Sequence, residues 1–294
     1  MYTYNDIDTS TKIVGVIGHP IKHSYSPLMH NLAFHLQKLN YIYLPFDVPP
    51  SNLKEVLKSM NVLGIRGFNV TLPHKEKIMQ FMDHVSEEAS MVGAVNTVVN
   101  EGNQLSGYNT DINGIVESLN TYKEKIFKST VSVIGAGGVA RSVLFALIRH
   151  FKVDEINIVN RTEERAEAMK DYFKDKMHFE NIHTHELMPK ENVEIYQNSN
   201  LIINTTSVGM FPNVEDTPTD IVDSFNESQI VFDLIYNPIK TKFLQIAELK
   251  NATILDGLKM FVVQGAKSFE LWTSSIMNDE QIYNELLKAL NTDS

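Results

Sequence analysis

Lys75 is the residue whose type and setting best suit acid/base chemistry in this chain. It ends the segment Asn69-Val70-Thr71-Leu72-Pro73-His74-Lys75, in which an extended apolar run leads into a proline. Pro73 suits the first position of a helix, and the pattern predicts a helix from Pro73 to about Asp83. Lys75 then lies in the first turn, where the helix dipole disfavours a cation by roughly 0.3–1 kcal/mol. An ammonium there gives up its proton more readily, so Lys75 is a candidate acid/base group, although its residue type alone favours an exposed surface lysine.

Three other polar segments have both a structural and a functional interpretation. In Ser24-Tyr25-Ser26-Pro27, Ser26 fits a helix N-cap with Pro27 at the first helical position. The segment 93–97 fits the start of a strand, and 108–111 fits a helix cap. Serine hydroxyls and asparagine amides also suit a polyhydroxy acid, because each ligand hydroxyl that leaves water needs a partner.

A glycine-rich turn follows a predicted strand at 131–134 and precedes a helical pattern at 141–150. Gly135 permits the tight turn, Gly137 lets the backbone approach a pyrophosphate, and Ala140 still allows close helix packing. The next strand follows about 20 residues on, which is the context that a dinucleotide-binding unit requires. A plain α/β domain with a glycine-rich loop is the alternative.

The end of that next strand indicates which dinucleotide binds. Enzymes that prefer NAD usually have Asp or Glu there, whereas this chain has Asn160-Arg161-Thr162, with Arg165 one turn on. Two guanidiniums and a hydroxyl suit a 2′-phosphate, so we expect NADP, and capping of the following helix by Thr162 is compatible with that role.

Alternating strands and helices predict an α/β fold of two domains. We expect strands at 12–18, 41–48, 65–71, 94–99, 104–107, 131–134, 155–160, 201–204, 230–234 and 253–255. We expect helices from 26 onwards, with Leu28, Leu32, Leu36 and Leu39 on one face, and at 51–60, 73–83, 141–150 and 258–290. The second half has the rhythm of a doubly wound, Rossmann-type parallel sheet.

Composition excludes several classes of protein and site. The chain has 294 residues and a net charge of −10, which disfavours a nucleic-acid partner. It has no cysteine, which excludes disulfides and thiolate chemistry and fits a cytoplasmic location. We expect no membrane span and no metal site, because no apolar run is long enough and the ten histidines, including His183 and His185, lack a ligand pattern.

Taken together, the motifs resemble the shikimate dehydrogenase family. The Ser-x-Ser pair, NVTLPHK, GAVNT, GYNTD, GAGG, NRTEER, NTTSVGM, DLIYNP and DG…QGA occur in the family's order from about Ile13 to Trp272. The resemblance implies a substrate domain, 1–112 plus 258–294, and an NADP-binding Rossmann domain, 113–257. Their cleft would hold the active site, in which 3-dehydroshikimate and shikimate are interconverted for the synthesis of aromatic amino-acid precursors.

The resemblance also implies roles for individual residues. Lys75 and Asp111 would form the catalytic pair, Ser24 and Ser26 would bind the substrate carboxylate, and Thr71, Asn96, Asp111 and Gln264 would bind ring hydroxyls, with Tyr236 lining the same pocket. The cofactor would be held by Gly135, Ala136, Gly137, Gly138, Val139 and Ala140 at the pyrophosphate, by Asn160, Arg161, Thr162 and Arg165 at the adenosine phosphate, and by Thr205, Met210 and Gly257 near the adenine–nicotinamide cleft.

Two alternatives remain at this point. One is a bifunctional quinate/shikimate dehydrogenase using NAD or NADP, because the segment 264–272 resembles that branch. The other is a non-catalytic ligand sensor, against which Lys75 and Asp111 argue. The chain is expected to act as a monomer or homodimer.

Overall fold

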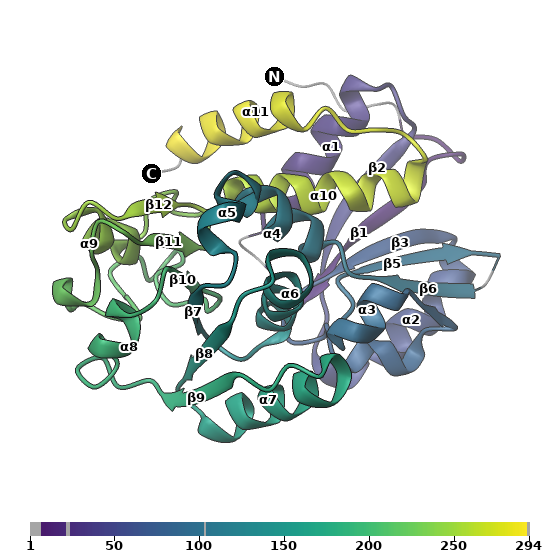
Figure 1. Ribbon diagram of the computed structural model, residues 1–294. Coiled ribbons are helices and arrows are strands. Elements are labelled where there is room, and N and C mark those ends of the chain that lie inside the picture. Colours follow the sequence, from purple (N-terminus) through teal and green to yellow (C-terminus); the bar gives the residue numbers. More distant parts are fainter. Residues whose placement is uncertain (1–6, 22–23, 103, 293–294) are drawn as a thin grey trace. The chain divides into compact units, whose positions relative to one another are not determined.

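The computed structural model describes residues 7–292, apart from 22–23 and 103. The chain divides into two compact units (Figure 1). The first unit comprises the chain up to Gly114 together with Val262–Ala289. The second comprises Ile115–Phe261 together with the chain from Leu290.

The first unit is built on a six-stranded mixed sheet in the order β2-β1-β3-β5-β6-β4. The strands are β1 (Lys12–Gly18), β2 (Tyr41–Asp47), β3 (Ile65–Val70), β4 (His84–Val85), β5 (Thr97–Glu101) and β6 (Gln104–Tyr108). β1 runs parallel to both β2 and β3, whereas β5 is antiparallel to β3 and β6. The predicted hairpin is confirmed, with Glu101 opposite Gln104.

Helices cover both faces of this sheet. The helices of this unit are α1 (Ser26–Leu36), α2 (Leu53–Leu63) and α3 (Glu87–Val92), with parts of α4 (Asp111–Leu119), α10 (Leu258–Thr273) and α11 (Asp279–Thr292), whose remaining residues belong to the second unit. Leu57 of α2 packs with Phe68 in one core cluster. Alternate residues of a strand point to opposite faces, so Asn69 lies on the other face, where it contacts Ser268 of α10. Phe269 of α10 also stacks on Phe34 of α1, with ring centroids 5.2 Å apart.

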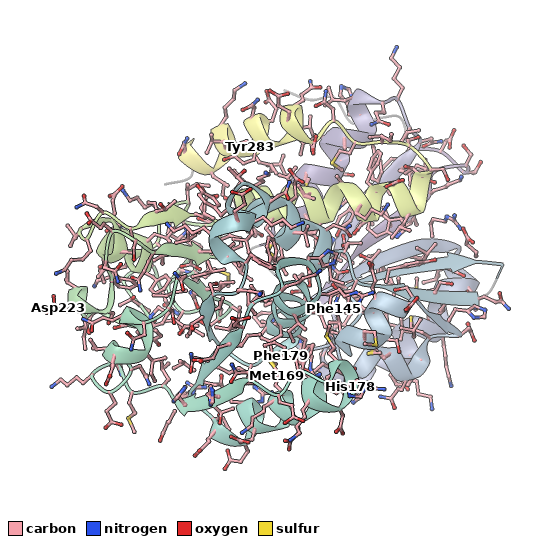
Figure 2. The ribbon with its side chains drawn as sticks, viewed as in Figure 1. Phe145, Met169, His178, Phe179, Asp223 and Tyr283 are labelled. Carbon is pink, nitrogen blue, oxygen red and sulfur yellow. The ribbon has the colours of Figure 1, made fainter. Side chains whose placement is uncertain are left out.

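The second unit contains a six-stranded parallel sheet in the order β12-β11-β10-β7-β8-β9. Its strands are β7 (Thr130–Ile134), β8 (Glu155–Asn160), β9 (Ile182–Glu186), β10 (Leu201–Asn204), β11 (Ile230–Asp233) and β12 (Thr253–Leu255). Its helices include α5 (Lys123–Ile126), α6 (Gly138–Ala146), α7 (Glu163–Met177), α8 (Val193–Gln197) and α9 (Lys242–Glu248). Figure 2 marks two of its buried side chains, Phe145 of α6 and Met169 of α7. The central strands are buried along their length, as expected for a parallel sheet covered by helices.

Two predicted helices are absent or interrupted in the structure. The helix predicted at 73–83 is wrong: Pro73 lies in a turn, in which the His74 N–H donates to the Thr71 carbonyl, and only a 3₁₀ helix at Lys77–Phe81 follows. The C-terminal region is interrupted between α10 and α11, where Ser274 takes a left-handed φ of 59°.

The buried face of α1 also differs from the predicted leucine face. Leu32 is buried, but Leu28 and Leu36 are exposed, and Met29, Ala33 and Phe34 take the interior positions. Within the described part of the chain, no helix combines the length and apolar character needed to cross a bilayer.

Candidate active site

The sheet of the first unit brings several chain segments to one edge. β1 and β3 are parallel, so the segments after Gly18 and after Val70 leave the sheet at the same edge. β5 is antiparallel to both β3 and β6, with Thr97 opposite Asn69 and Tyr108. The residue that enters β5, Asn96, and the residues that follow β6 therefore lie at this edge too.

Lys75 and Asp111 meet at this edge. Lys75 Nζ donates to Asp111 Oδ2 at 2.6 Å, and the two side chains are 13% and 6% exposed. The Lys75 carbonyl accepts from the Val95 N–H at 2.8 Å, so its backbone pairs with a distant segment and not within a helix. The helix-dipole argument for Lys75 therefore fails, and the neighbouring carboxylate is what distinguishes this lysine from a surface lysine.

Asn96 holds the second oxygen of the carboxylate. The Thr110 backbone N–H, which only donates, lies 2.7 Å from Asn96 Oδ1. This contact fixes the amide so that Asn96 Nδ2 faces Asp111 Oδ1 at 2.8 Å. Nδ2 also lies 3.4 Å from Gln264 Oε1. Four residues predicted from separate motifs, Lys75, Asn96, Asp111 and Gln264, are thus joined by hydrogen bonds.

The predicted carboxylate-binding serines and Thr71 occupy the same sheet edge. Ser24 Oγ accepts from the Ser26 N–H at 3.3 Å, which places the two serines side by side. Ser26 is not an N-cap, because Tyr25 holds that position and no side chain caps the helix. The Thr71 N–H donates to the Ile17 carbonyl at 3.0 Å, next to the end of β1. No hydrogen bond joins these three residues to Asp111 among the interactions of the described chain.

Tyr236 belongs to the second unit, in the segment after β11. Its ring stacks on Phe261 with centroids 4.2 Å apart. Its predicted place beside the substrate therefore stays a prediction.

The glycine turn of the second unit has the backbone that a phosphate site requires. Gly135 has a φ of 108°, and a Cβ there would lie 2.5 Å from Thr205 Oγ1, so only glycine fits. A Cβ on Gly137 would meet nothing within 4 Å, which leaves open space over the turn. Helix α6 begins at Gly138, earlier than predicted, without a side-chain cap or an acidic residue in its first turn. Its free N–H groups and dipole therefore suit a pyrophosphate.

The segment after β8 presents two cationic side chains. Arg161 and Arg165 are exposed and have no ion-pair partner among the described residues. Thr162 is the N-cap residue of α7, but its hydroxyl makes no capping hydrogen bond and is exposed. Asn160 Nδ2 donates to the Thr162 carbonyl at 2.7 Å and shapes this segment. These groups fit the 2′-phosphate of NADP.

Asp233, a buried carboxylate in the DLIYNP motif to which the sequence analysis gave no role, orders the neighbouring strand ends. Asp233 Oδ2 accepts from Thr241 at 2.6 Å, and its Oδ1 accepts from Asn204 at 3.0 Å and from the Ile235 N–H at 3.1 Å. Burial raises the pKa of Asp233 to about 6. These bonds fix the chain next to Thr205 and Tyr236.

Gly257 follows β12 and packs against the backbone that follows β11. A Cβ on Gly257 would lie 2.1 Å from the Leu234 carbonyl, so no other residue fits without movement of the backbone. Its N–H donates to the Ile235 carbonyl at 3.0 Å.

The histidines near the site have structural partners. His74 Nε2 lies 2.7 Å from the Val48 carbonyl, and His19 Nδ1 lies 2.7 Å from Asp47 on the surface. His30 is fully buried and stacks on Tyr43, and burial lowers the pKa of His30 to about 3. His23 lies outside the described residues. Within the described chain, no three His, Asp or Glu residues form a cluster able to hold a metal ion.

Comparison with known proteins gives a consistent family assignment. Residues 16–98 match the shikimate dehydrogenase substrate-binding domain, and residues 118–255 match shikimate/quinate 5-dehydrogenase. The NADP(+)-dependent shikimate dehydrogenase of Caldanaerobacter subterraneus subsp. tengcongensis is 42% identical over 280 residues, covering 95% of this chain and 98% of the relative.

Two solved structures are similar over nearly the whole chain. A crystal structure of shikimate dehydrogenase in complex with NADP+ has a TM-score of 0.88 at 39% identity, covering 97% of both chains. Shikimate 5-dehydrogenase from Listeria monocytogenes, in complex with shikimate and NAD, has a TM-score of 0.84 at 35% identity, covering 96% of this chain and 98% of that chain. These matches and the joined site residues agree, and the chain belongs to the shikimate dehydrogenase family.

Proposed function

We propose that this chain catalyses the reversible, NADP-dependent reduction of 3-dehydroshikimate to shikimate. The observation that carries the proposal is the nearly buried contact of 2.6 Å between Lys75 Nζ and Asp111 Oδ2, next to Asn96, which in turn contacts Gln264 of α10. Similarity to shikimate dehydrogenases supports the substrate, and the exposed Arg161 and Arg165 support the phosphorylated cofactor.

The residues of the first unit account for proton transfer and substrate binding. Reduction of a ketone adds a hydride to the carbon and a proton to the oxygen. When bound, NADPH supplies the hydride. Lys75 donates the proton to the oxygen and regains one from solvent, and in the reverse direction its neutral amine accepts the proton. Asp111 holds the ammonium in place and, with Asn96 and Gln264, offers hydrogen-bonding groups for the ring hydroxyls. Ser24 and Ser26 bind the carboxylate, and Thr71 binds a hydroxyl.

The second unit would hold the cofactor. The open turn 135–140 and the N-terminus of α6 suit the pyrophosphate, because their N–H groups and the helix dipole favour an anion. The segment 160–165 suits the adenosine phosphate. The segments that carry Thr205, Met210 and Gly257 suit the rest of the dinucleotide.

Replacing Lys75 tests this assignment. Lys75→Ala should lower kcat by about 10²–10⁴-fold while the KM for shikimate changes little, because proton transfer acts in the transition state. Lys77→Ala, at an exposed lysine two residues on, is the matched control and should behave as the wild type. Near-normal turnover of Lys75→Ala would show that another group transfers the proton.

A substrate panel tests the alternative of a bifunctional enzyme. Shikimate and quinate are each assayed with NADP and with NAD by the absorbance of the reduced nicotinamide. The proposal expects the highest kcat/KM for shikimate with NADP. Comparable values for quinate with NAD would instead identify the bifunctional type. A cytoplasmic location and a monomeric or homodimeric state stay predictions from the sequence.

A further inference from the structure

We propose that Ser268, a residue of α10 to which the sequence assigns no role, is a positioning residue for substrate binding, acting through Gln264. The inference rests on the proposed function, because it assumes that Gln264 binds a ring hydroxyl. Ser268 itself is fully buried. It therefore touches neither substrate nor cofactor and can influence binding only through its neighbours.

The Ser268 hydroxyl joins four parts of the first unit. It accepts from Asn69 Nδ2 at 2.8 Å, and it lies 2.8 Å from Thr97 Oγ1 and 3.2 Å from Thr110 Oγ1. It also donates to the Gln264 carbonyl at 3.1 Å, one turn earlier in the helix. The contacts thus reach β3, β5, the segment between β6 and α4, and α10 itself.

These contacts come from side chains that are themselves held in place. Asn69 Oδ1 accepts from the Tyr43 hydroxyl at 2.8 Å, and Asn69 Nδ2 also donates to Thr97 at 3.1 Å. Thr97 Oγ1 lies 3.1 Å from Asn96 Oδ1. The sheet therefore holds the partners of Ser268 in place. Through its hydrogen bonds to them, the Ser268 hydroxyl attaches α10 to β3 and β5.

Gln264 is the functional residue that this attachment controls. Its Oε1 lies 3.4 Å from Asn96 Nδ2, at the long end of a hydrogen bond, so a small movement of the helix breaks the contact. Asn96 Oδ1 also accepts from the Thr110 backbone N–H at 2.7 Å, a contact that does not involve Ser268. Loss of the Ser268 hydroxyl would therefore displace Gln264 relative to Asn96 and Asp111 without releasing the catalytic pair.

The rest of α10 is anchored by other contacts, so removal of this hydroxyl should leave the fold intact. Trp272 Nε1 donates to the Val98 carbonyl at 3.0 Å, and Phe269 stacks on Phe34. Gly265 lies against α1, where a Cβ would come within 2.1 Å of Met29. Ser268 thus holds only the helical turn of α10 that carries Gln264, and other residues hold the rest of the helix.

A double-mutant cycle on the full-length enzyme tests the proposal. Ser268→Ala should raise the KM for shikimate by about fivefold to tenfold, with the KM for NADP unchanged within about twofold. In a Gln264→Ala background, Ser268→Ala should change the shikimate KM by less than about twofold, because the residue through which it acts is gone. An equal rise in both backgrounds would overturn the proposal, since it would show that Ser268 does not act through Gln264.

Ser199→Ala is the matched control in the second unit. Ser199 is also buried, donates to the carbonyl four residues earlier, of Ile195, at 2.9 Å, and shares a hydroxyl contact of 2.7 Å with Ser132. It should lower the melting temperature as Ser268→Ala does but leave the shikimate KM unchanged. If Ser268→Ala does not fold, Thr97→Val removes the partner hydroxyl, and the same rise in shikimate KM is expected. Because Thr97 also contacts Asn96, this rise must disappear in the Gln264→Ala background.

The cycle also separates this inference from the proposed function. If Gln264→Ala alone leaves the shikimate KM unchanged, the substrate role of Gln264 is wrong. If Gln264→Ala raises that KM and neither Ser268→Ala nor Thr97→Val does, only the positioning role is wrong.

Discussion

Arg161 and Arg165 lie at the start of α7, where an anion gains both from the guanidiniums and from the helix dipole. Both side chains are exposed, and Glu163 and Glu164 occupy the first turn between them. Neither carboxylate forms an ion pair with these arginines in the described part of the chain, so both guanidiniums are available to a phosphate. This arrangement predicts a preference for the phosphorylated dinucleotide.

Arg161→Ala should separate the two cofactors. The KM for NADP should rise by about 10–100-fold, because a charge-assisted hydrogen bond is worth about 1.5–3 kcal/mol, while the KM for NAD stays within about twofold. Arg149→Ala, at an exposed arginine elsewhere in the second unit, is the control. Equal losses with both cofactors would mean that Arg161 does not contact the 2′-phosphate.

At the residue scale, the sequence predicted which residues meet but not how they are held. The Lys75–Asp111 pair and its contacts to Asn96 and Gln264 were expected from motifs. Ser268 and Asp233 were given no role, since a single buried serine or aspartate has no periodic signal. For Asp233 the one sign in the sequence is a carboxylate within the apolar run 230–235.

At the scale of single elements, β2 is an edge strand of the first sheet, and backbone donors on its outer side are paired or missing. Asn31 of α1 pairs with the backbone of Tyr43 in β2 as a neighbouring strand would, donating to its carbonyl at 2.9 Å and accepting from its N–H at 2.8 Å. Two residues before, the Tyr41 N–H bonds to the Leu39 carbonyl, and two residues after, Pro45 has no N–H. This strand therefore offers no free donor at 41, 43 or 45 for pairing with another chain.

Asn31→Ala should expose one donor and one acceptor of this edge strand. We expect a loss of about 1–3 kcal/mol in the free energy of unfolding, measured by urea denaturation, and more self-association at high protein concentration, measured by size-exclusion chromatography. Asn31→Asp keeps the acceptor for the Tyr43 N–H and should lose less. If alanine and aspartate variants were as stable as the wild type, the amide would have no role at this edge.

Strands were predicted better than helices for a physical reason. The buried strands of the second unit, such as Glu155–Asn160 and Leu201–Asn204, agree with the prediction because their apolar runs admit no other placement. The helix predicted after Pro73 is absent because the Lys75 carbonyl pairs with Val95, a contact between residues far apart in the sequence. The pattern of apolar and polar residues around Pro73 does not predict a hydrogen bond to a residue 20 positions away.

At the scale of the whole molecule, the two units should respond oppositely to mild acid through two buried groups. Burial lowers the pKa of His30 in the first unit from 6.5 to about 3, so its contribution to stability is full above pH 6.5 and is lost as the pH falls towards 3. Burial raises the pKa of Asp233 in the second unit from 3.8 to about 6, so the folded state gains stability as the pH falls from about 6 to 3.8. Each effect is at most about 1.4 kcal/mol per pH unit.

Variants isolate these two effects from other titrating groups, such as His74 and His185, whose pKa values burial also lowers. His30→Phe keeps an aromatic ring against Tyr43, and the free energy of unfolding of the wild type relative to this variant should fall as the pH is lowered from 7 to 5. Relative to Asp233→Asn, the wild type should instead gain stability over the same interval. Amide hydrogen exchange, which reports on each unit separately, measures both differences. If both differences had the same sign, burial would not be what controls the ionisation of these two groups.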